Sequence, residues 1–409
     1  MTKKVLLIAY HFPPILGSSG VHRALSFARY LPEFGWTPLV LTVQPQAYPE
    51  QRVGLTEEVP AHLHVERAWA LDTARHLSVG GRYPRAWATP DRWTSWRFDA
   101  VRRGKRLLRE HDVSALWSSY PIGTAHAIGL ALQRGSGKPW LADFRDPMAQ
   151  HDYPSDPQLR QAYYALEKTT VAQAKLVTLT TPGAVTLYRA RYAGAAERIH
   201  LLENGYDEAL FSGAVAAPPL VPDKITVLHS GVVYPKERDP THLFAALSFL
   251  AARHPDVADR VRFRFRAPGD TQFLLSLAQR FAVGHLIEVM PPVDYRNAIN
   301  EMLSADALLI LQASNCNAQI PGKLYEYLRA RKPIIALTDP AGDTAWCLRK
   351  YGIDTQASLD APEQIVALLS RLPSLLDRFD PSTAEEGIRH TSRRARTEQF
   401  AGLLEHMIS

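Results

Sequence analysis

The stretch QIPGKLYEY, residues 319–327, decides the fold, and it lies between two apolar runs. ADALLIL at 305–311 precedes it and RKPIIAL at 331–337 follows it, and both runs are typical of buried parallel strands. The sequence therefore predicts that a strand enters a polar loop, and that the loop opens a helix with Glu326 near its first turn. A helix N-terminus offers unpaired backbone N–H groups and the positive end of a dipole, which suits a diphosphate. A carboxylate one turn further can accept two ribose hydroxyls, so the unit predicts a nucleotide site without the glycine-rich dinucleotide fingerprint.

Strands and amphipathic helices alternate along both halves of the chain, with short connections between them. In the first half we expect strands at 5–10, 37–43, 115–118, 139–144 and 176–180, and helices at 20–30, 123–134 and 157–174. In the second half we expect strands at 224–229, 260–265, 286–290, 305–311 and 334–337, and a helix at 241–252. This alternation predicts an α/β protein built from doubly wound parallel sheets.

Length predicts two Rossmann-like domains, because 409 residues are too many for one ordinary domain. The segment 214–222 is rich in small residues and proline, so we expect domains at 1–213 and 214–381. Open parallel sheets bind ligands at the carboxyl ends of their strands, and we expect the two domains to face one cleft. The loops at those ends are 11–20, 118–126, 143–147, 204–206, 229–238, 266–270, 290–295 and 312–323.

Composition narrows the class of protein. The apolar fraction of 46% and the charged fraction of 22% are typical of a globular protein, and no window approaches the roughly 18 apolar residues of a membrane span. The first apolar run is too short for a signal peptide, so we expect a cytoplasmic protein with Cys316 and Cys347 reduced. The net charge of +6 permits an anionic ligand or an anionic membrane surface. No nucleic-acid-binding module is recognisable, and we expect no nucleic-acid partner.

Several polar motifs follow the expected strands. The loop 11–20 is long for a strand-to-helix connection, and its glycines Gly17 and Gly20 allow close backbone approach to an anion. Two acids and an arginine, Asp143, Arg145 and Asp146, suit either acceptor hydroxyls or an internal ion pair.

The segment that follows the first strand of the second half contains Gly231, Lys236 and Arg238. Arginine binds a diphosphate through paired hydrogen bonds and lysine binds it as a point charge, so the segment predicts a diphosphate clamp. The alternative is a solvated cluster of charges.

Three further features have both a functional and a purely structural interpretation. His126 lies one turn into an expected helix, where a lone histidine is more often packed than catalytic. The pair Asn204 and Gly205 is typical of a tight turn. The basic helix 97–109 lies near Trp87 and Trp96, a combination that suits either an anionic membrane surface or a solvated helix face.

In this order the motifs resemble GT-B glycosyltransferases, and within them the retaining glycosyltransferase family 4 group, over nearly the whole chain. The motifs that carry the resemblance are YHFPP at 10–14, GSSG at 17–20, DFRDP at 143–147, ENGYD at 203–207, GVVYPKERDP at 231–240, AD at 305–306 and PGKLYEY at 321–327.

The resemblance implies a nucleoside-diphosphate sugar donor in the C-terminal domain and a hydroxyl acceptor in the N-terminal domain, with no bound cofactor and no required metal. It also implies that a last helix, expected at 382–409, crosses back to the N-terminal domain. The donor-binding residues would be Gly17, Ser18, Ser19, Gly20, Gly231, Val293, Gln319, Ile320, Gly322, Lys323 and Glu326. The catalytic candidates would be Arg238, Lys236, His126 and Asp143, and the acceptor-binding candidates His11, Arg145, Asp146 and Asn204. Arg238 and Lys236 would neutralise the leaving diphosphate, Lys323 would add to that charge or support its loop, and Glu326 would bind the ribose.

The sequence departs from the family pattern at two places. The family's glutamate pair has Glu326 in the second position, but Ala318 occupies the first, so Asn317, Gln319 or backbone amides would have to replace it. A histidine often follows an N-terminal-domain strand in this family, but Ser118, Ser119 and Tyr120 occupy that loop, which leaves His126 as the nearest candidate.

The expected activity is transfer of a sugar, with retention, in the synthesis of a surface polysaccharide, glycolipid or other glycoconjugate. A lipid-linked acceptor and peripheral contact with an anionic membrane are also expected. The alternatives are a non-catalytic nucleotide-sugar-binding subunit of a glycan assembly complex and a nucleotide-sugar epimerase.

Overall fold

The computed structural model describes residues 2–15, 20–51, 58–151, 153–216, 219–382 and 385–409. It divides into two compact units: unit 1 comprises Met1–Asn204 and Arg393–Ser409, and unit 2 comprises Gly205–Ser392. These boundaries differ from 213/214 and 381/382 because buried side chains extend unit 2 at both ends. Phe211 lies in its core before the proline-rich segment, and Ile388 lies in the same core beyond residue 381.

Within the described residues, unit 1 is built on a seven-stranded sheet of order β3-β2-β1-β4-β5-β6-β7, and every neighbouring pair is parallel. Its strands are β1 (Lys3–Ile8), β2 (Trp36–Val43), β3 (His64–Ala68), β4 (Val113–Ser119), β5 (Trp140–Arg145), β6 (Leu176–Leu179) and β7 (Ile199–Leu201). Its helices are α1 (Gly20–Tyr30), α2 (Thr73–His76), α3 (Trp96–Glu110), α4 (Gly123–Ser136), α5 (Pro157–Gln173), α6 (Pro182–Arg191) and α17 (Arg393–Ile408).

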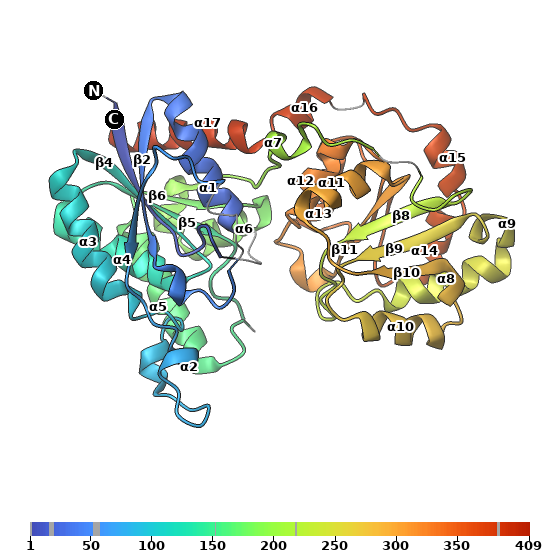
Figure 1. Ribbon diagram of the computed structural model, residues 1–409, viewed down its shortest axis with the longest axis horizontal. Helices are drawn as coiled ribbons and strands as arrows, with labels where there is room; N and C mark the ends of the chain where they lie inside the picture. Colours follow the sequence, from blue (N-terminus) through green and yellow to red (C-terminus); the bar gives the residue numbers. More distant parts are fainter. Residues whose placement is uncertain (1, 16–19, 52–57, 152, 217–218, 383–384) are drawn as a thin grey trace. The chain divides into compact units, whose positions relative to one another are not determined.

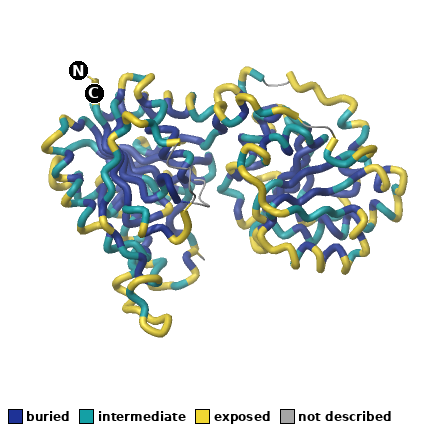
Figure 2. Tube along the Cα trace, viewed as in Figure 1, coloured by how far each residue is buried: buried dark blue, intermediate teal, exposed yellow. Residues whose placement is uncertain are grey.

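Two hydrophobic cores lie on opposite faces of this sheet, because successive strand residues alternate between the faces. Leu6 of β1 belongs to the core that includes residues of α3 and α4, whereas Leu7 belongs to the core beneath α1 and α17. Figures 1 and 2 show these two helix layers and the buried strands between them.

Within the described residues, unit 2 is built on a six-stranded parallel sheet of order β10-β9-β8-β11-β12-β13. Its strands are β8 (Ile225–Ser230), β9 (Val261–Arg266), β10 (Ile287–Met290), β11 (Ala307–Gln312), β12 (Ile334–Thr338) and β13 (Gln356–Ala357). Its helices are α7 (Glu208–Phe211), α8 (Thr241–Arg253), α9 (Pro255–Ala258), α10 (Thr271–Arg280), α11 (Tyr295–Ser304), α12 (Lys323–Ala330), α13 (Asp343–Lys350), α14 (Pro362–Leu369), α15 (Leu372–Asp377) and α16 (Glu385–Arg389). Residues of α8, α10 and α14 pack on one face of the sheet, and residues of α11, α12 and α13 pack on the other (Figure 1).

The C-terminal helix α17 is part of unit 1. The ring of Phe400 stacks on Phe27 of α1 with centroids 4.4 Å apart. Arg396 of α17 donates to Glu203 at 2.9 Å in a buried ion pair. The last helix thus returns to the N-terminal unit, and it begins at Arg393 because the residues just before it complete unit 2.

The α/β fold class predicted from the sequence is confirmed, and the expected helix at 20–30 has the observed bounds of α1. The prediction did not include β3, β7 and β13. These strands lie at sheet edges or are only two to five residues long, so their apolar pattern is too short to stand out. Cys316 and Cys347 are buried in unit 2 and no disulfide links them.

Candidate functional site

The unit around QIPGKLYEY folds as the sequence predicts. Strand β11 ends at Gln312, a loop follows, and α12 begins at Lys323 with Gly322 as the residue before it. Strand β12 then runs parallel to β11, with Leu308 paired to Ile334. The loop and the start of α12 therefore lie at the carboxyl edge of the sheet, where β8 also ends.

Lys323 is the first residue of α12, and its ammonium nitrogen lies 3.0 Å from Nε2 of His229 at the end of β8. A Cβ atom placed on Gly231 would lie 3.3 Å from the same nitrogen, and Gly231 has φ +105°, a conformation that favours glycine. Burial and the nearby Arg238 guanidinium hold the pKa of Lys323 well below its usual value. The amine nitrogen of Lys323 thus lies close to the backbone at the carboxyl end of β8.

Arg238 lies at the same edge. It donates from Nη1 to the carbonyl oxygen of Val232 at 3.0 Å, and its guanidinium stacks on Tyr234 at 5.1 Å. Its Nε atom is buried and has no hydrogen-bond partner among the described residues. Lys323 lies close enough for the Arg238 charge to lower its pKa. Lys236, by contrast, is exposed.

Glu326 is half-buried in the first turn of α12 and accepts a hydrogen bond from the hydroxyl of Tyr295, at the start of α11. One residue further, the Tyr327 hydroxyl accepts the Ser230 N–H at 2.9 Å and ties α12 to the end of β8. The carboxylate and the two cations thus lie on elements that contact one another directly.

The loop before α12 is held by hydrogen bonds to residues that follow β12. Asn317 donates to Asp339 at 2.7 Å, and the carbonyl of Gln319 accepts from Thr344 at 3.1 Å. Ile320 is buried in the core, so it can contribute only backbone groups to a ligand. Because Asn317 is engaged by Asp339, Gln319 is the remaining side chain that could replace a glutamate at position 318.

Val293 lies in the loop after β10 and is 41% exposed. Arg266, at the end of β9, donates to the carbonyl of Pro291 at 2.6 Å and forms an ion pair with Glu301. This buried arginine holds the loop that carries Val293 next to the carboxyl edge of the sheet.

Unit 1 has a different carboxyl edge. Asp143 is fully buried and accepts two hydrogen bonds from Arg23 of α1, at 2.8 and 2.9 Å, and a third from Thr178 at 2.9 Å. Arg23 also donates to the carbonyls of Leu202 and Glu203. Asp143 is therefore the centre of an internal ion pair in this structure, and it leaves the set of proposed catalytic residues because its oxygens are occupied by protein donors.

His126 is a core residue. Its ring is fully buried among Tyr120, Trp140 and Phe144, and Nδ1 lies 2.8 Å from the hydroxyl oxygen of Ser118. Burial lowers its pKa to about 3, so the imidazole is neutral at physiological pH. Because no part of the ring is exposed, His126 also leaves the set of catalytic residues that we propose.

His11 and Arg145 lie near each other at the end of the unit 1 sheet. Burial, with a contribution from the Arg145 charge, lowers the pKa of His11 to about 3. Arg145 has φ +62°, which is uncommon for a residue with a side chain and is found preferentially at functional sites. Asp146 follows directly and its charge acts on Arg145. The sequence-predicted acceptor residues His11, Arg145 and Asp146 are thus brought together.

Asn204 lies beside the Arg23 network, with its side-chain oxygen 3.4 Å from Arg23 and its carbonyl accepting from Arg396. Gly20 begins α1, whereas Gly17, Ser18 and Ser19 lie outside the described residues.

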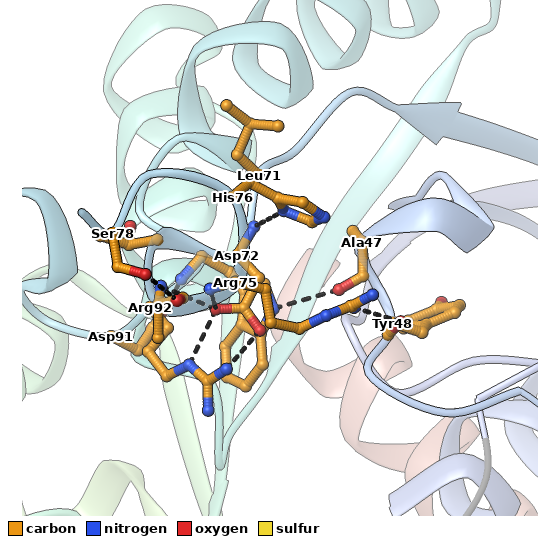
Figure 3. A network of polar contacts seen from close by, with 12 residues as sticks. Ala47, Tyr48, Leu71, Asp72, Arg75, His76, Ser78, Asp91 and Arg92 are labelled. Atoms are coloured by element: carbon orange, nitrogen blue, oxygen red, sulfur yellow. Dashed lines mark hydrogen bonds and ion pairs between the residues drawn. The ribbon is translucent and has the colours of Figure 1, made fainter. Parts of the chain in front are cut away.

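The segment between β3 and α3 is anchored by a second polar network in unit 1 (Figure 3). The fully buried Asp72 pairs with Arg92 and accepts the Ala74 N–H at 3.0 Å, while Arg75 donates to the carbonyl of Tyr48 at 2.7 Å. Asp91 accepts from both the backbone and the hydroxyl of Thr124, at 2.7 and 2.9 Å, near the start of α4. These bonds hold a segment whose Trp87 side chain is 52% exposed.

Three of the six basic side chains of α3, within the stretch 97–109 expected to be a basic face, form ion pairs inside unit 1. Arg102 pairs with Asp99, Arg103 pairs with Asp99 and Glu66, and Arg106 pairs with Glu66. Trp96 is fully buried. These arginines therefore belong to the fold of unit 1 rather than to an open cationic surface.

Sequence reasoning missed His229, Tyr295 and Tyr327. His229 interrupts an apolar strand one residue before its end, and a polar residue at that position was the available signal. The hydroxyls of Tyr295 and Tyr327 gave no signal, because tyrosine in a helix is usually interpreted as packing.

Among the described residues, no group of three or more histidine, cysteine or acidic side chains is arranged to hold a metal ion, and no helix is long and apolar enough to cross a membrane.

Comparison with known proteins identifies the fold. Residues 19–205 match the family described as Glycosyl transferase 4-like domain. No curated protein sequence matches the chain.

Solved structures align with it over nearly their whole length. Sucrose-phosphate synthase from Thermosynechococcus elongatus has a TM-score of 0.71 at 14% identity, over 99% of this chain and 98% of that one. A glycosyltransferase from Rickettsia africae has a TM-score of 0.68 at 13% identity and covers 100% of both chains. HepE from Anabaena, in complex with UDP and glucose, has a TM-score of 0.67 at 14% identity, over 99% of this chain and 100% of that one. Residues 19–205 thus correspond to a Glycosyl transferase 4-like domain, and the chain as a whole has the GT-B fold and resembles the glycosyltransferase family 4 group.

Proposed function

We propose that the protein transfers a sugar from a nucleoside-diphosphate sugar to a hydroxyl acceptor, with retention at the anomeric carbon. Unit 2 binds the donor and unit 1 binds the acceptor. The observation that carries the proposal is the convergence of Lys323 and Arg238 at one sheet edge with Glu326 on the same helix as Lys323. Neither cation forms an ion pair with a carboxylate among the described residues, which favours an external anion as their partner.

In this proposal the cations stabilise the negative charge that grows on the departing diphosphate. Hydrogen-bond donors held in place before the reaction are effective there because they need no reorganisation as charge develops. Glu326 binds the ribose, oriented by the hydroxyl of Tyr295. No metal is assigned to the reaction, because Lys323, Arg238 and the start of α12 supply the positive charge. HepE, which has the same fold, has been crystallised with UDP-glucose, and this supports a nucleotide-sugar donor here.

On the acceptor side we propose that His11, Arg145 and Asp146 contact the acceptor hydroxyl or its neighbours. A glycolipid or lipid-linked precursor of a surface polysaccharide is the acceptor that we favour, at the cytoplasmic face of a membrane. The membrane contact is assigned to the exposed aromatic side chains Trp69, Tyr83 and Trp87, since Arg102, Arg103 and Arg106 of α3 are paired within unit 1. If so, flotation with anionic liposomes is lost in a Trp69→Ser, Trp87→Ser variant and retained in a variant with Phe249→Ser, an exposed aromatic residue of unit 2.

A thermal-shift series with nucleoside diphosphates and their sugars tests the donor. A ligand that binds only the native state raises the melting temperature, so one nucleotide and its sugars should stand out. Release of that nucleoside diphosphate from the donor, measured with and without added EDTA, then tests catalysis and the absence of a metal requirement. If no nucleotide shifts the melting temperature, the proposal is wrong.

A second candidate is a non-catalytic nucleotide-sugar-binding subunit. It is favoured by Ala318 at the position of the family's first glutamate and by the enclosure of His126 in the core. Binding without any release of nucleoside diphosphate, in the presence of candidate acceptors, would support it. Conversion of one nucleotide sugar into another would indicate an epimerase instead.

A further inference from the structure

His229 is a buried polar side chain that the proposed mechanism has not used. It is the last residue but one of β8 and is 1% exposed. Its Nδ1 atom lies 3.0 Å from the carbonyl oxygen of Leu309 on the neighbouring strand β11. A carbonyl oxygen can only accept, so Nδ1 carries a proton and donates it. This hydrogen bond favours one tautomer, in which the lone pair of the neutral ring lies on Nε2. The backbone of Val232 also interacts with the ring.

That lone pair faces the amine of Lys323 at 3.0 Å. Lys323 can donate to Nε2 only while the imidazole is neutral, because a charged ring carries a proton at both nitrogens. Burial and the adjacent Lys323 charge both hold the pKa of His229 well below its usual value, which keeps the ring neutral. The other charges acting on this pair are Arg238 and, on α12, Glu326.

The arrangement leaves two N–H groups of the Lys323 ammonium without a protein acceptor among the described residues. Among the described residues, no carboxylate forms an ion pair with Lys323. The charge of Glu326 affects Lys323 only at longer range. The glycine at position 231 keeps open the space next to the nitrogen, since a Cβ there would lie at 3.3 Å. A partly buried cation with unused donors and an open approach is suited to an anion.

We propose that His229 is a positioning residue, which holds the Lys323 ammonium at the carboxyl end of β8 and directs its remaining N–H groups toward the diphosphate of the donor. A neutral imidazole can do this without cancelling the lysine charge, whereas a carboxylate in its place would neutralise the lysine and repel the diphosphate. The inference rests on the proposed function, because it assigns His229 to the same donor site.

The test compares two substitutions of His229 with a matched control. Gln retains an acceptor near the position of Nε2, whereas Leu fills similar space and accepts nothing. His285→Leu removes an exposed histidine of the same unit and serves as the control. The probes are UDP, GDP and ADP; the affinity of the one that most stabilises the wild-type protein is measured by titration calorimetry, with the melting temperature of each ligand-free variant measured alongside.

The His229→Leu variant should bind that nucleoside diphosphate at least about tenfold more weakly, because a charge-assisted hydrogen bond that orients Lys323 is lost. His229→Gln should recover most of the affinity, and His285→Leu should bind as the wild type does. In a Lys323→Met background, His229→Leu should cause little further loss, since a residue that acts through Lys323 has nothing left to position.

Two results would overturn the role of His229 alone: equal binding by the Leu and Gln variants, or losses from His229→Leu and Lys323→Met that multiply fully in the double variant. Either would mean that the histidine acts only on the fold or not at all. Wild-type protein that responds to none of the three nucleotides would instead count against the nucleotide donor itself, and the role of His229 would fail with it.

Discussion

The carboxyl edges of the two sheets differ in whether their charged side chains have partners of opposite charge. In unit 1 the Asp143 carboxylate is fully buried and paired with Arg23, and each has further hydrogen bonds to the protein. In unit 2 Lys323 and Arg238 approach each other, and among the described residues neither has a carboxylate partner. In unit 1 the paired charges stabilise the fold, whereas the unpaired positive charges of unit 2 suit the anionic ligand that we propose.

The energetics explain why this distinction is informative. A buried ion pair roughly balances the cost of desolvation against the attraction between its members, whereas a buried charge left alone is strongly unfavourable. Two neighbouring cations are therefore an expensive feature unless an anion joins them during function. Strongly altered pKa values at such a place favour a functional site, and Lys323 and His229 both have them.

The largest effect should come from breaking the buried ion pair between Arg23 and Asp143 in unit 1. Arg23→Ala leaves Asp143 buried without its cation, and we expect the free energy of unfolding to fall by about 3–5 kcal/mol. Urea denaturation followed by circular dichroism measures this. Arg102→Ala, which removes a mostly exposed arginine that pairs with Asp99, is the control and should cost no more than about 1 kcal/mol. Equal losses in the two variants would mean that the burial of the Arg23 pair does not increase its effect on the free energy of unfolding.

The next largest effect should come from Arg238 at the carboxyl edge of unit 2, and it should appear in catalysis rather than in stability. Arg238→Ala should lower turnover by about a hundredfold to a thousandfold, because one donor to the developing charge is lost. Its melting temperature should stay close to that of the wild type, since Arg238 forms no ion pair among the described residues. Arg253→Ala, at an exposed arginine that stacks on Phe249, is the control and should keep full activity. Near-normal turnover in the Arg238 variant would remove the donor site from this edge.

The pH dependence of stability should show that His126 is a buried, neutral residue of the unit 1 core. Its pKa is about 3 in the folded protein and 6.5 in the unfolded chain, so the unfolded state binds more protons between these values. The stability contributed by the neutral ring is complete above pH 6.5 and is lost as the pH falls toward 3, by about 3 kcal/mol near pH 4.

Denaturation midpoints of wild type and His126→Asn, measured from neutral pH down to about pH 4, test this. Because His11 and His229 also titrate in the wild type, only the difference between the two profiles reports on His126. Parallel profiles would show that the ring is not held neutral in solution.

The smallest effect concerns Glu326, the carboxylate that we propose binds the ribose. Tyr295→Phe removes the hydroxyl that donates to Glu326, and we expect the donor KM to rise by no more than about tenfold, equivalent to about 1.4 kcal/mol, with turnover nearly unchanged. Steady-state kinetics with varied donor measure it. Glu326→Ala, which removes the carboxylate itself, should be far more damaging than Tyr295→Phe. A ranking in the reverse order would show that Tyr295 has its own role in the site.

Sequence patterns predicted the long buried elements well and the roles of polar residues less well. The run 305–311 and helix 20–30 are long and regular, so periodicity was enough to find them. The motifs 231–240 and 321–327 lie at the edge of unit 2 where we propose the donor site. The prediction gave Lys236 the second cationic role, and our proposal gives that role to Lys323 because Lys236 is exposed. Distance along the chain is a poor guide here, because Lys323 is contributed by a helix about ninety residues beyond β8, which brings it to His229.

The amino-acid sequence by itself determined the α/β class, the parallel sheets and the resemblance to GT-B glycosyltransferases, because these depend on apolar periodicity and on short local motifs. Only the tertiary structure decided which charged and polar side chains have a partner within the protein and which do not. Whether Asp143 is a catalyst or one half of an ion pair depends on α1, and whether His229 is a core residue or a support for Lys323 depends on α12. The physical reason is that burial and charge pairing are properties of three-dimensional neighbourhoods, which no local stretch of sequence contains.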